Sequence, residues 1–105
     1  MTSFTQQLSG HLAGLEYQHL SPEVVTKVKH LLLDYIGYTA YGSEEESAGI
    51  LRSVIGAMGG EGEAGVIGHP DRLPAQNAAF LNGAGGHMAE LDDTHRGTQS
   101  HPGDS

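Results

Sequence analysis

Residues 21–42 read SPEVVTKVKHLLLDYIGYTAYG, and this stretch determines the fold class that the sequence predicts. Ser21 supplies a capping oxygen, Pro22 has the φ angle wanted at a first helical position, and Glu23 faces the positive end of the helix dipole. Apolar side chains then recur with the helical period; they are Val24, Val25, Val28, Leu31, Leu32, Tyr35 and Ile36. The sequence predicts a helix that ends near Gly42 and is buried on more than one side.

Three further helices are expected around this one. They cover about residues 4–15, 45–58 and 74–90, where apolar or small side chains recur every three or four positions. The glycine-rich residues 61–74 are expected to be irregular, with at most a short extended piece at 64–67. After Leu91 the chain is polar. The predicted fold class is therefore all-α, with about four helices.

Two features inside these helices depart from the simple pattern. The run Gly83-Ala84-Gly85-Gly86 lowers helix propensity, so we expect it to permit the close approach of another backbone or of a ligand. Asp34 interrupts the apolar helix. Because a buried carboxylate needs a partner, we interpret Asp34 as a structural hydrogen-bond acceptor.

The charge balance excludes several classes of partner. The chain has 105 residues, with 5 Lys and Arg against 13 Asp and Glu, which gives a formal charge of −8. So few cations cannot form the basic face that nucleic acid or an anionic membrane requires. The absence of Cys excludes disulfides, thiolate zinc sites and thiol nucleophiles. Neither a targeting segment nor a membrane span is apparent, so a cytoplasmic location is expected.

The composition also predicts that the chain does not stand alone. Only 37% of its residues are hydrophobic and 16 are Gly, whose backbone entropy opposes folding. We therefore expect this chain to assemble with a companion or to be one part of a larger protein.

One glycine motif is misleading. Residues 60–65, GEGEAG, match the dinucleotide fingerprint G-x-G-x-x-G in form. The fingerprint acts between a strand and a helix N-terminus, where backbone amides meet pyrophosphate. Here it follows a helix, and Glu61 and Glu63 would repel that anion. We interpret the segment as a connector.

The residues richest in chemistry lie near the end of the chain. Three imidazoles, three carboxylates and a hydroxyl gather within fifteen residues; they are His87, His95, His101, Glu90, Asp92, Asp93 and Thr94. Such groups suit proton transfer between substrate atoms, and their nitrogen and oxygen atoms also suit Zn, Mn or Fe. A solvated polar tail is equally compatible with the composition. Residue chemistry alone leaves these three interpretations open.

A family resemblance rests on an ordered series of short motifs. They are Leu31-Leu32-Leu33-Asp34-Tyr35-Ile36-Gly37 before Gly42-Ser43, Gly59-Gly60 with Val66-Ile67-Gly68, Leu73-Pro74-Ala75 with Ala78-Ala79, Asn82-Gly83-Ala84, and His87-x-x-Glu90-Leu91-Asp92-Asp93-Thr94-His95 leading to His101-Pro102-Gly103. In this order the series resembles the N-terminal part of the MmgE/PrpD family.

The resemblance implies a dimeric enzyme with a mostly helical domain and a separate α+β lid domain. It implies acid–base chemistry next to a carboxylate, without a cofactor, on small di- or tricarboxylates: dehydration, decarboxylation or epimerisation. Residues 1–105 are then expected to be an incomplete N-terminal portion of the helical domain, with the lid absent and an active-site loop at 91–105. The rest of the enzyme chain or a companion subunit would complete the site, and this chain alone would be inactive.

The resemblance also assigns roles within the polar stretch, where no residue is expected to bind a metal. The implied catalytic residues are Glu90, Asp93, Thr94 and His101, and the implied substrate-binding residues are Asp92, His95 and Arg96. Glu90 stands where the family usually has Asp. The alternative to an enzyme is a non-catalytic helical module for assembly or binding, and a third interpretation is metal-assisted lyase chemistry.

Overall fold

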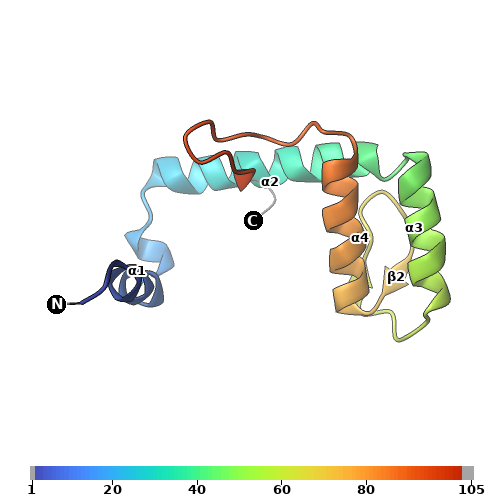
Figure 1. Cartoon of the computed structure of the whole chain (residues 1–105), viewed down its shortest axis with the longest axis horizontal. Helices are drawn as coiled ribbons and strands as arrows, with labels where there is room; N and C mark the ends of the chain where they lie inside the picture. The colour runs from blue at the N-terminus through green and yellow to red at the C-terminus, as the bar shows by residue number, and fades with distance from the viewer. Residues whose placement is uncertain (1, 103–105) are drawn as a thin grey trace.

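The computed structural model describes residues 2–102, which fold into four α-helices and one small antiparallel sheet (Figure 1). The elements in order are α1 (Phe4–Ala13), the 3₁₀ helix η1 (Tyr17–His19), α2 (Pro22–Gly42), α3 (Glu46–Ala57), β1 (Ala64–Gly65), β2 (Arg72–Leu73) and α4 (Ala75–Met88). The prediction of a mostly helical fold with four helices is confirmed. Strand β2 and η1 were not predicted. Gly103 and the end of the 91–105 segment lie outside the described residues.

Helices α2 and α4 begin where side-chain oxygens satisfy their first amides. Ser21 Oγ accepts a hydrogen bond from the Val24 amide at 3.3 Å, as expected for an N-cap. At α4 the cap comes from farther away, since Glu63 Oε2 accepts a hydrogen bond from the Ala75 amide at 3.2 Å. Glu63 belongs to the motif that resembles a dinucleotide fingerprint. Its carboxylate thus caps the helix start, the place where that fingerprint would hold a phosphate.

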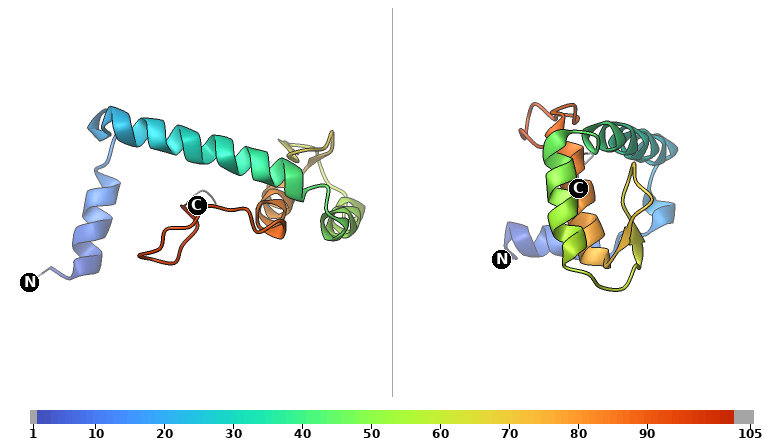
Figure 2. Two further views of the ribbon diagram at one scale, coloured as in Figure 1. Left: turned by 90° about the horizontal axis from the view of Figure 1, so that it is seen from above. Right: turned by 90° about the vertical axis from the view of Figure 1, so that its right-hand side faces the viewer.

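Helix α4 crosses the C-terminal end of α2 at very short range (Figures 1 and 2). Gly42, Gly85 and Gly86 are buried at this crossing. A Cβ atom on Gly86 would lie 3.0 Å from the Tyr35 ring and 3.2 Å from Thr39 Oγ1. The prediction that small residues in the last helix permit the approach of another backbone is confirmed for Gly85, which meets the backbone of Gly42, whereas Gly86 leaves room for the Tyr35 and Thr39 side chains.

A small hydrophobic core lies where α3, α4 and the β-hairpin meet. Its buried members are Ile55, Val66, Ala78 and Leu81, and the partly buried Leu51, Ala64 and Leu73 pack against them. Asn82 joins the hairpin to α4, because its Oδ1 accepts from the Ile67 amide at 2.8 Å and its Nδ2 donates to Gly65 O at 3.2 Å. The hairpin therefore has both apolar and polar attachments to the helices.

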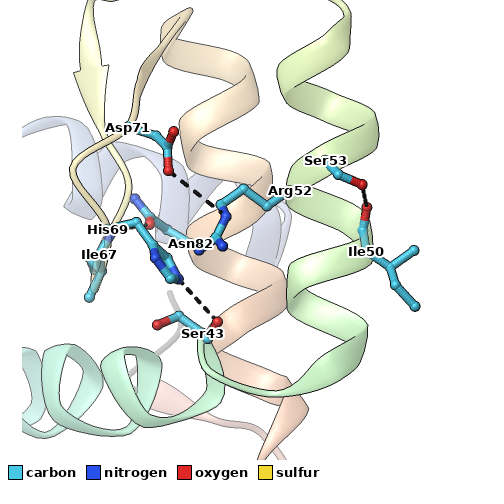
Figure 3. Close-up of polar contacts among 8 residues, drawn as sticks. All are labelled: Ser43, Ile50, Arg52, Ser53, Ile67, His69, Asp71 and Asn82. Atoms are coloured by element: carbon cyan, nitrogen blue, oxygen red, sulfur yellow. Dashed lines mark hydrogen bonds and ion pairs between the residues drawn. The ribbon is translucent and has the colours of Figure 1, made fainter.

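A second set of polar contacts ties the loop of the hairpin to α2 and α3 (Figure 3). His69 Nε2 donates to the carbonyl oxygen of Ser43 at 3.1 Å, and Arg52 Nε lies 3.9 Å from Asp71 Oδ2. His69 thus has a structural role. These contacts and the core make residues 38–88 the compact part of the molecule.

The N-terminal part is extended by comparison. Figure 1 shows α1 standing apart from the compact part, joined to it by the long α2. The radius of gyration is 16.9 Å, whereas a compact chain of this length has one of about 13 Å. Large apolar side chains are exposed along α1 and α2; they are Phe4, Leu8, Leu12, Val24, Val28, Leu32, Leu33 and Ile36. We call this set the exposed apolar face.

Asp34 lies on α2 within the same extended part and is exposed. The prediction that Asp34 is a buried acceptor is therefore wrong for this structure. The reason is that, within residues 2–102, α4 is the only helix that packs extensively on α2, and it covers only the C-terminal end of α2.

None of the helices within residues 2–102 is both long and apolar enough to cross a bilayer.

Candidate functional site

The candidate site is formed by the end of α4 and the segment that follows it. The helix ends at Met88, and Glu90 adopts a positive φ of 49°, which turns the chain away from the helix axis. Leu91 then lines an open groove of about 520 Å³ with α2 residues, among them Leu33 and Tyr38. The chain therefore contacts α2 at Leu91, and the segment that follows runs back in the direction of the N-terminal part of α2 (Figure 1).

Asp92 lies at the centre of a cluster with two imidazole rings. His87 Nδ1 is 2.8 Å from Asp92 Oδ2, and His101 Nδ1 is 3.2 Å from the same oxygen. The Asp92 side chain is only 4% exposed, whereas the His87 and His101 side chains are 66% and 38% exposed. A buried carboxylate thus has its partners on the solvent side. We call these three residues the His–Asp–His cluster.

The hydrogen bond from His87 lowers the pKa of Asp92 below the ordinary value for an aspartate, although burial acts in the opposite direction. The positive charges that His101 and His87 can carry lower it further. Asp92 is therefore ionised near neutral pH and can only accept hydrogen bonds. It follows that the Nδ1 atom of each imidazole carries a proton.

This tautomer determines what His101 can do. Its Nδ1 also lies 2.8 Å from the carbonyl oxygen of Asp93, so the same N–H is shared between two acceptors. With Nδ1 protonated, the atom that gains or loses a proton is Nε2. The rings of His87 and His101 meet edge to face, with centroids 5.7 Å apart. The arrangement suits general acid–base catalysis, in which a carboxylate orients an imidazole.

The residues between Asp93 and His101 form a small hairpin of their own. The His95 amide donates to Ser100 O at 2.8 Å, and His95 and Ser100 form an isolated antiparallel bridge. His95 Nδ1 lies 2.9 Å from Thr98 Oγ1, so this ring faces the hairpin rather than Asp92. Arg96 lies in the turn of the hairpin and is exposed.

The structure brings together only part of the predicted site. Asp92, Asp93 and His101 are in mutual contact through the His101 ring. Glu90 and Thr94 are exposed and belong to the segments on either side of the cluster. The roles assigned to Glu90, Thr94, His95 and Arg96 stay predictions. Glu90 reaches the cluster through its backbone, since its amide donates to the carbonyl oxygen of His87 at 3.2 Å.

Residue chemistry included His87 among the candidate groups of the polar stretch, but the family resemblance assigned it no role. The signal that could have identified His87 is its position at the end of the predicted helix. His87 is in the last turn of α4, so a chain that reverses direction at Glu90 brings Asp92 back to it. Among residues 2–102, no group of three or more His, Asp or Glu side chains has an arrangement that could hold a metal ion.

Comparison with known proteins identifies the family. Residues 6–105 match the model of the MmgE/PrpD N-terminal domain. The chain belongs to the MmgE/PrpD family. All four helices except the first two residues of α1 lie within this match, and so does the His–Asp–His cluster.

Three curated proteins are similar to the chain. The cis-aconitate decarboxylases of Mus musculus and Homo sapiens are 32% and 33% identical over 95 residues, which are 90% of this chain and 20% of each relative. The cis-aconitate decarboxylase-like protein oryM of Aspergillus oryzae is 33% identical over 97 residues, 92% of this chain and 20% of that protein. The chain thus spans about a fifth of the length of these relatives. No solved structure matches it.

Proposed function

We propose that this chain supplies the acid–base part of the active site of an MmgE/PrpD enzyme. The observation that carries the proposal is the placement of His101, whose Nδ1–H contacts both the buried Asp92 carboxylate and Asp93 O. In this arrangement the carboxylate orients the ring and stabilises its charged form, while Nε2 exchanges the proton with the substrate.

The proposed reaction takes place at a carbon next to a substrate carboxylate. Neutral His101 accepts a proton from that carbon, or charged His101 delivers one, and the intermediate between these states is an enolate. Loss of water from the enolate gives dehydration, and return of the proton to its other face gives epimerisation. In decarboxylation, loss of carbon dioxide itself leaves the electron pair of the enolate, and charged His101 then delivers a proton to it. This chemistry needs no cofactor, because the carboxylate of the substrate accepts the electron pair.

The proposed substrates are small di- or tricarboxylates. The names of the similar proteins support cis-aconitate, whose decarboxylation would make the enzyme a lyase. Dehydration of 2-methylcitrate and epimerisation of iminodisuccinate, the latter an isomerase activity, are the alternatives within the family. Glu90 stands where the family usually has Asp, and its side chain is longer by one methylene. The replacement favours a substrate that differs in size from the substrates of family members with Asp at this position.

Further residues of the loop are proposed to complete this half of the site. Glu90, Asp93 and Thr94 join His101 as catalytic residues, and His95 and Arg96 bind the substrate. Asp92, which the resemblance assigned to substrate binding, is proposed instead to act through His101, because its ionised carboxylate would repel a carboxylate substrate. Arg96 is the cation of this loop, and an enolate with several carboxylates requires more positive charge than one Arg supplies. The additional cations are proposed to come from the rest of the enzyme or from a companion subunit.

The exposed apolar face supports the need for such a complement. Apolar side chains of α1 and α2 that meet solvent in this chain alone would be covered in an assembled homodimeric enzyme. We propose that the enzyme acts in the cytoplasm and that the 105-residue chain alone has no activity. The same exposed apolar face favours the second candidate function, a helical module that assembles without catalysis.

The two candidates differ in their response to a substitution of His101. The assembled protein is incubated with cis-aconitate, 2-methylcitrate and iminodisuccinate, and carbon dioxide release, water loss and epimerisation are measured. His101→Ala should lower kcat by about 100-fold or more, the usual contribution of a general acid or base. His11→Ala, which removes an exposed ring on α1, is the matched control. Full activity of the His101→Ala protein would refute the catalytic assignment.

A further inference from the structure

His87 and His101 reach one carboxylate oxygen from two different parts of the chain. His87 is in the last turn of α4, whereas His101 follows the small hairpin that contains His95 and Ser100. Their Nδ1 atoms lie 2.8 Å and 3.2 Å from Asp92 Oδ2, so His87 makes the shorter contact. The loop and the helix are therefore joined through Asp92.

The two imidazoles differ in how firmly their backbone is held. His87 directly follows Gly85 and Gly86, both of which are buried against α2. His101 belongs to a segment whose other residues, 94–100, are all exposed. Side chains on a packed helix hold their geometry better than those on a loop. The position of His87 on α4 therefore determines the position of the loop residues that contact it through Asp92.

We propose that His87 is a positioning residue, whose Nδ1–H fixes the Asp92 carboxylate and thereby sets the orientation of the His101 ring. This inference rests on the proposed function of His101 and adds a residue that the chemistry itself does not require. A group that orients a catalytic side chain affects the reaction rate through geometry, since a displacement of the catalytic group by about 1 Å lowers the rate on the order of 100-fold. His87 itself exchanges no proton with the substrate.

Two amide side chains separate this role from a catalytic one. The Nδ2 atom of Asn is bonded to Cγ, as is Nδ1 of His, so Asn can donate a hydrogen bond from nearly the same place. The Nε2 atom of Gln corresponds instead to the other ring nitrogen. If His87 acts through Nδ1–H, then His87→Asn should retain the function, and His87→Gln and His87→Leu should lose it.

The experiment measures kcat and KM of the assembled enzyme with these three variants. We expect His87→Asn to keep kcat within about threefold, and the Gln and Leu variants to lose roughly 10- to 100-fold in kcat at little changed KM. Equal losses in all three variants would mean that the ring of His87 acts directly. Unchanged kcat in all three would mean that His87 has no role, and either result overturns the inference.

A second measurement does not depend on turnover. Nitrogen-15 NMR of the imidazoles reports which ring nitrogen of His101 carries the proton, in the wild type and in each variant. We expect the Nδ1–H tautomer of His101 in the wild type and in His87→Asn, and a mixture of tautomers in the Gln and Leu variants. Identical tautomer populations in the wild type and in all three variants, whether one tautomer or a mixture, would overturn the positioning role. If no carboxylate is turned over but the NMR pattern holds, only the proposed function fails.

Discussion

The backbone of Gly42 touches the backbone of Gly85, so that a Cβ atom on Gly42 would overlap the carbonyl oxygen of Gly85. This contact sets the distance between α2 and α4. It involves no side chain, and its partner atoms cannot move without shifting a helix.

The contact predicts the effect of one added methyl group. Gly42→Ala should lower the free energy of unfolding by about 1–3 kcal/mol, because the new Cβ meets backbone rather than a flexible side chain. Gly37→Ala is the control on the same helix, since a Cβ at Gly37 has open space around it. That variant should be neutral or more stable by up to about 1 kcal/mol. Chemical denaturation of both proteins checks this, and equal stabilities would contradict the described crossing.

A second prediction concerns the attachment of the β-hairpin. Asn82→Ala should lower the free energy of unfolding by roughly 1–3 kcal/mol, because the Ile67 amide loses its acceptor at a partly buried place. Ser53→Ala removes a hydrogen bond to Ile50 O that lies on the surface of α3, and it should change stability by less than about 0.5 kcal/mol. Hydrogen exchange at the Ile67 amide should be faster in the Asn82 variant alone.

The helices could be predicted from the sequence because their signals are local. Ser21 and Pro22 mark the start of α2, and both the apolar period and the caps act within a few residues. The core formed by α3, α4 and the hairpin was harder to predict from the sequence, because β2 has only two residues and forms by pairing with β1. Asp34 was misjudged because an apolar period indicates which face is suited to burial, not whether a partner covers it.

The candidate site shows the same limit. The family motif pointed to Asp92, Asp93 and His101, but the convergence of His87 on Asp92 depends on a turn at Glu90 that brings the chain back to α4. Spacing on a continuing helix would instead place His87 beside Glu90. The glycine run was interpreted correctly at Gly85, which meets the backbone of Gly42. Gly86 instead leaves room for side chains of α2, and a Cβ at Gly83 has open space.

The lowered pKa of Asp92 predicts a dependence of stability on acid. Because the pKa is lower in the folded protein than in the unfolded chain, ionised Asp92 stabilises the fold fully above its ordinary pKa of about 4. This contribution is lost as the pH falls through that value towards the lowered pKa of the folded state. Unfolding free energies measured from neutral to acidic pH should therefore decline less steeply in Asp92→Asn than in the wild type. Parallel curves would show that Asp92 does not contribute to acid sensitivity.

Arg96 provides a test of substrate binding that is separate from proton transfer. If it binds a substrate carboxylate, Arg96→Ala should raise KM by about tenfold or more with a smaller change in kcat, as for the loss of a charged hydrogen bond. Lys27→Ala removes an exposed cation from α2 and serves as the control for the loss of one positive charge. A similar rise in KM for both variants would indicate a general effect of charge.

The α2–α4 crossing and the His–Asp–His cluster are adjacent in the chain, because Gly85 and Gly86 are followed at once by His87. Each residue of an α-helix turns the chain by about 100°. One residue inserted between Gly86 and His87 would leave the crossing intact yet carry the imidazole about a quarter of a turn away from Asp92. The spacing between the glycines of the α2–α4 crossing and His87 thus determines whether the imidazole can reach Asp92. The number of residues in this last turn of α4 is therefore as constrained as their identity.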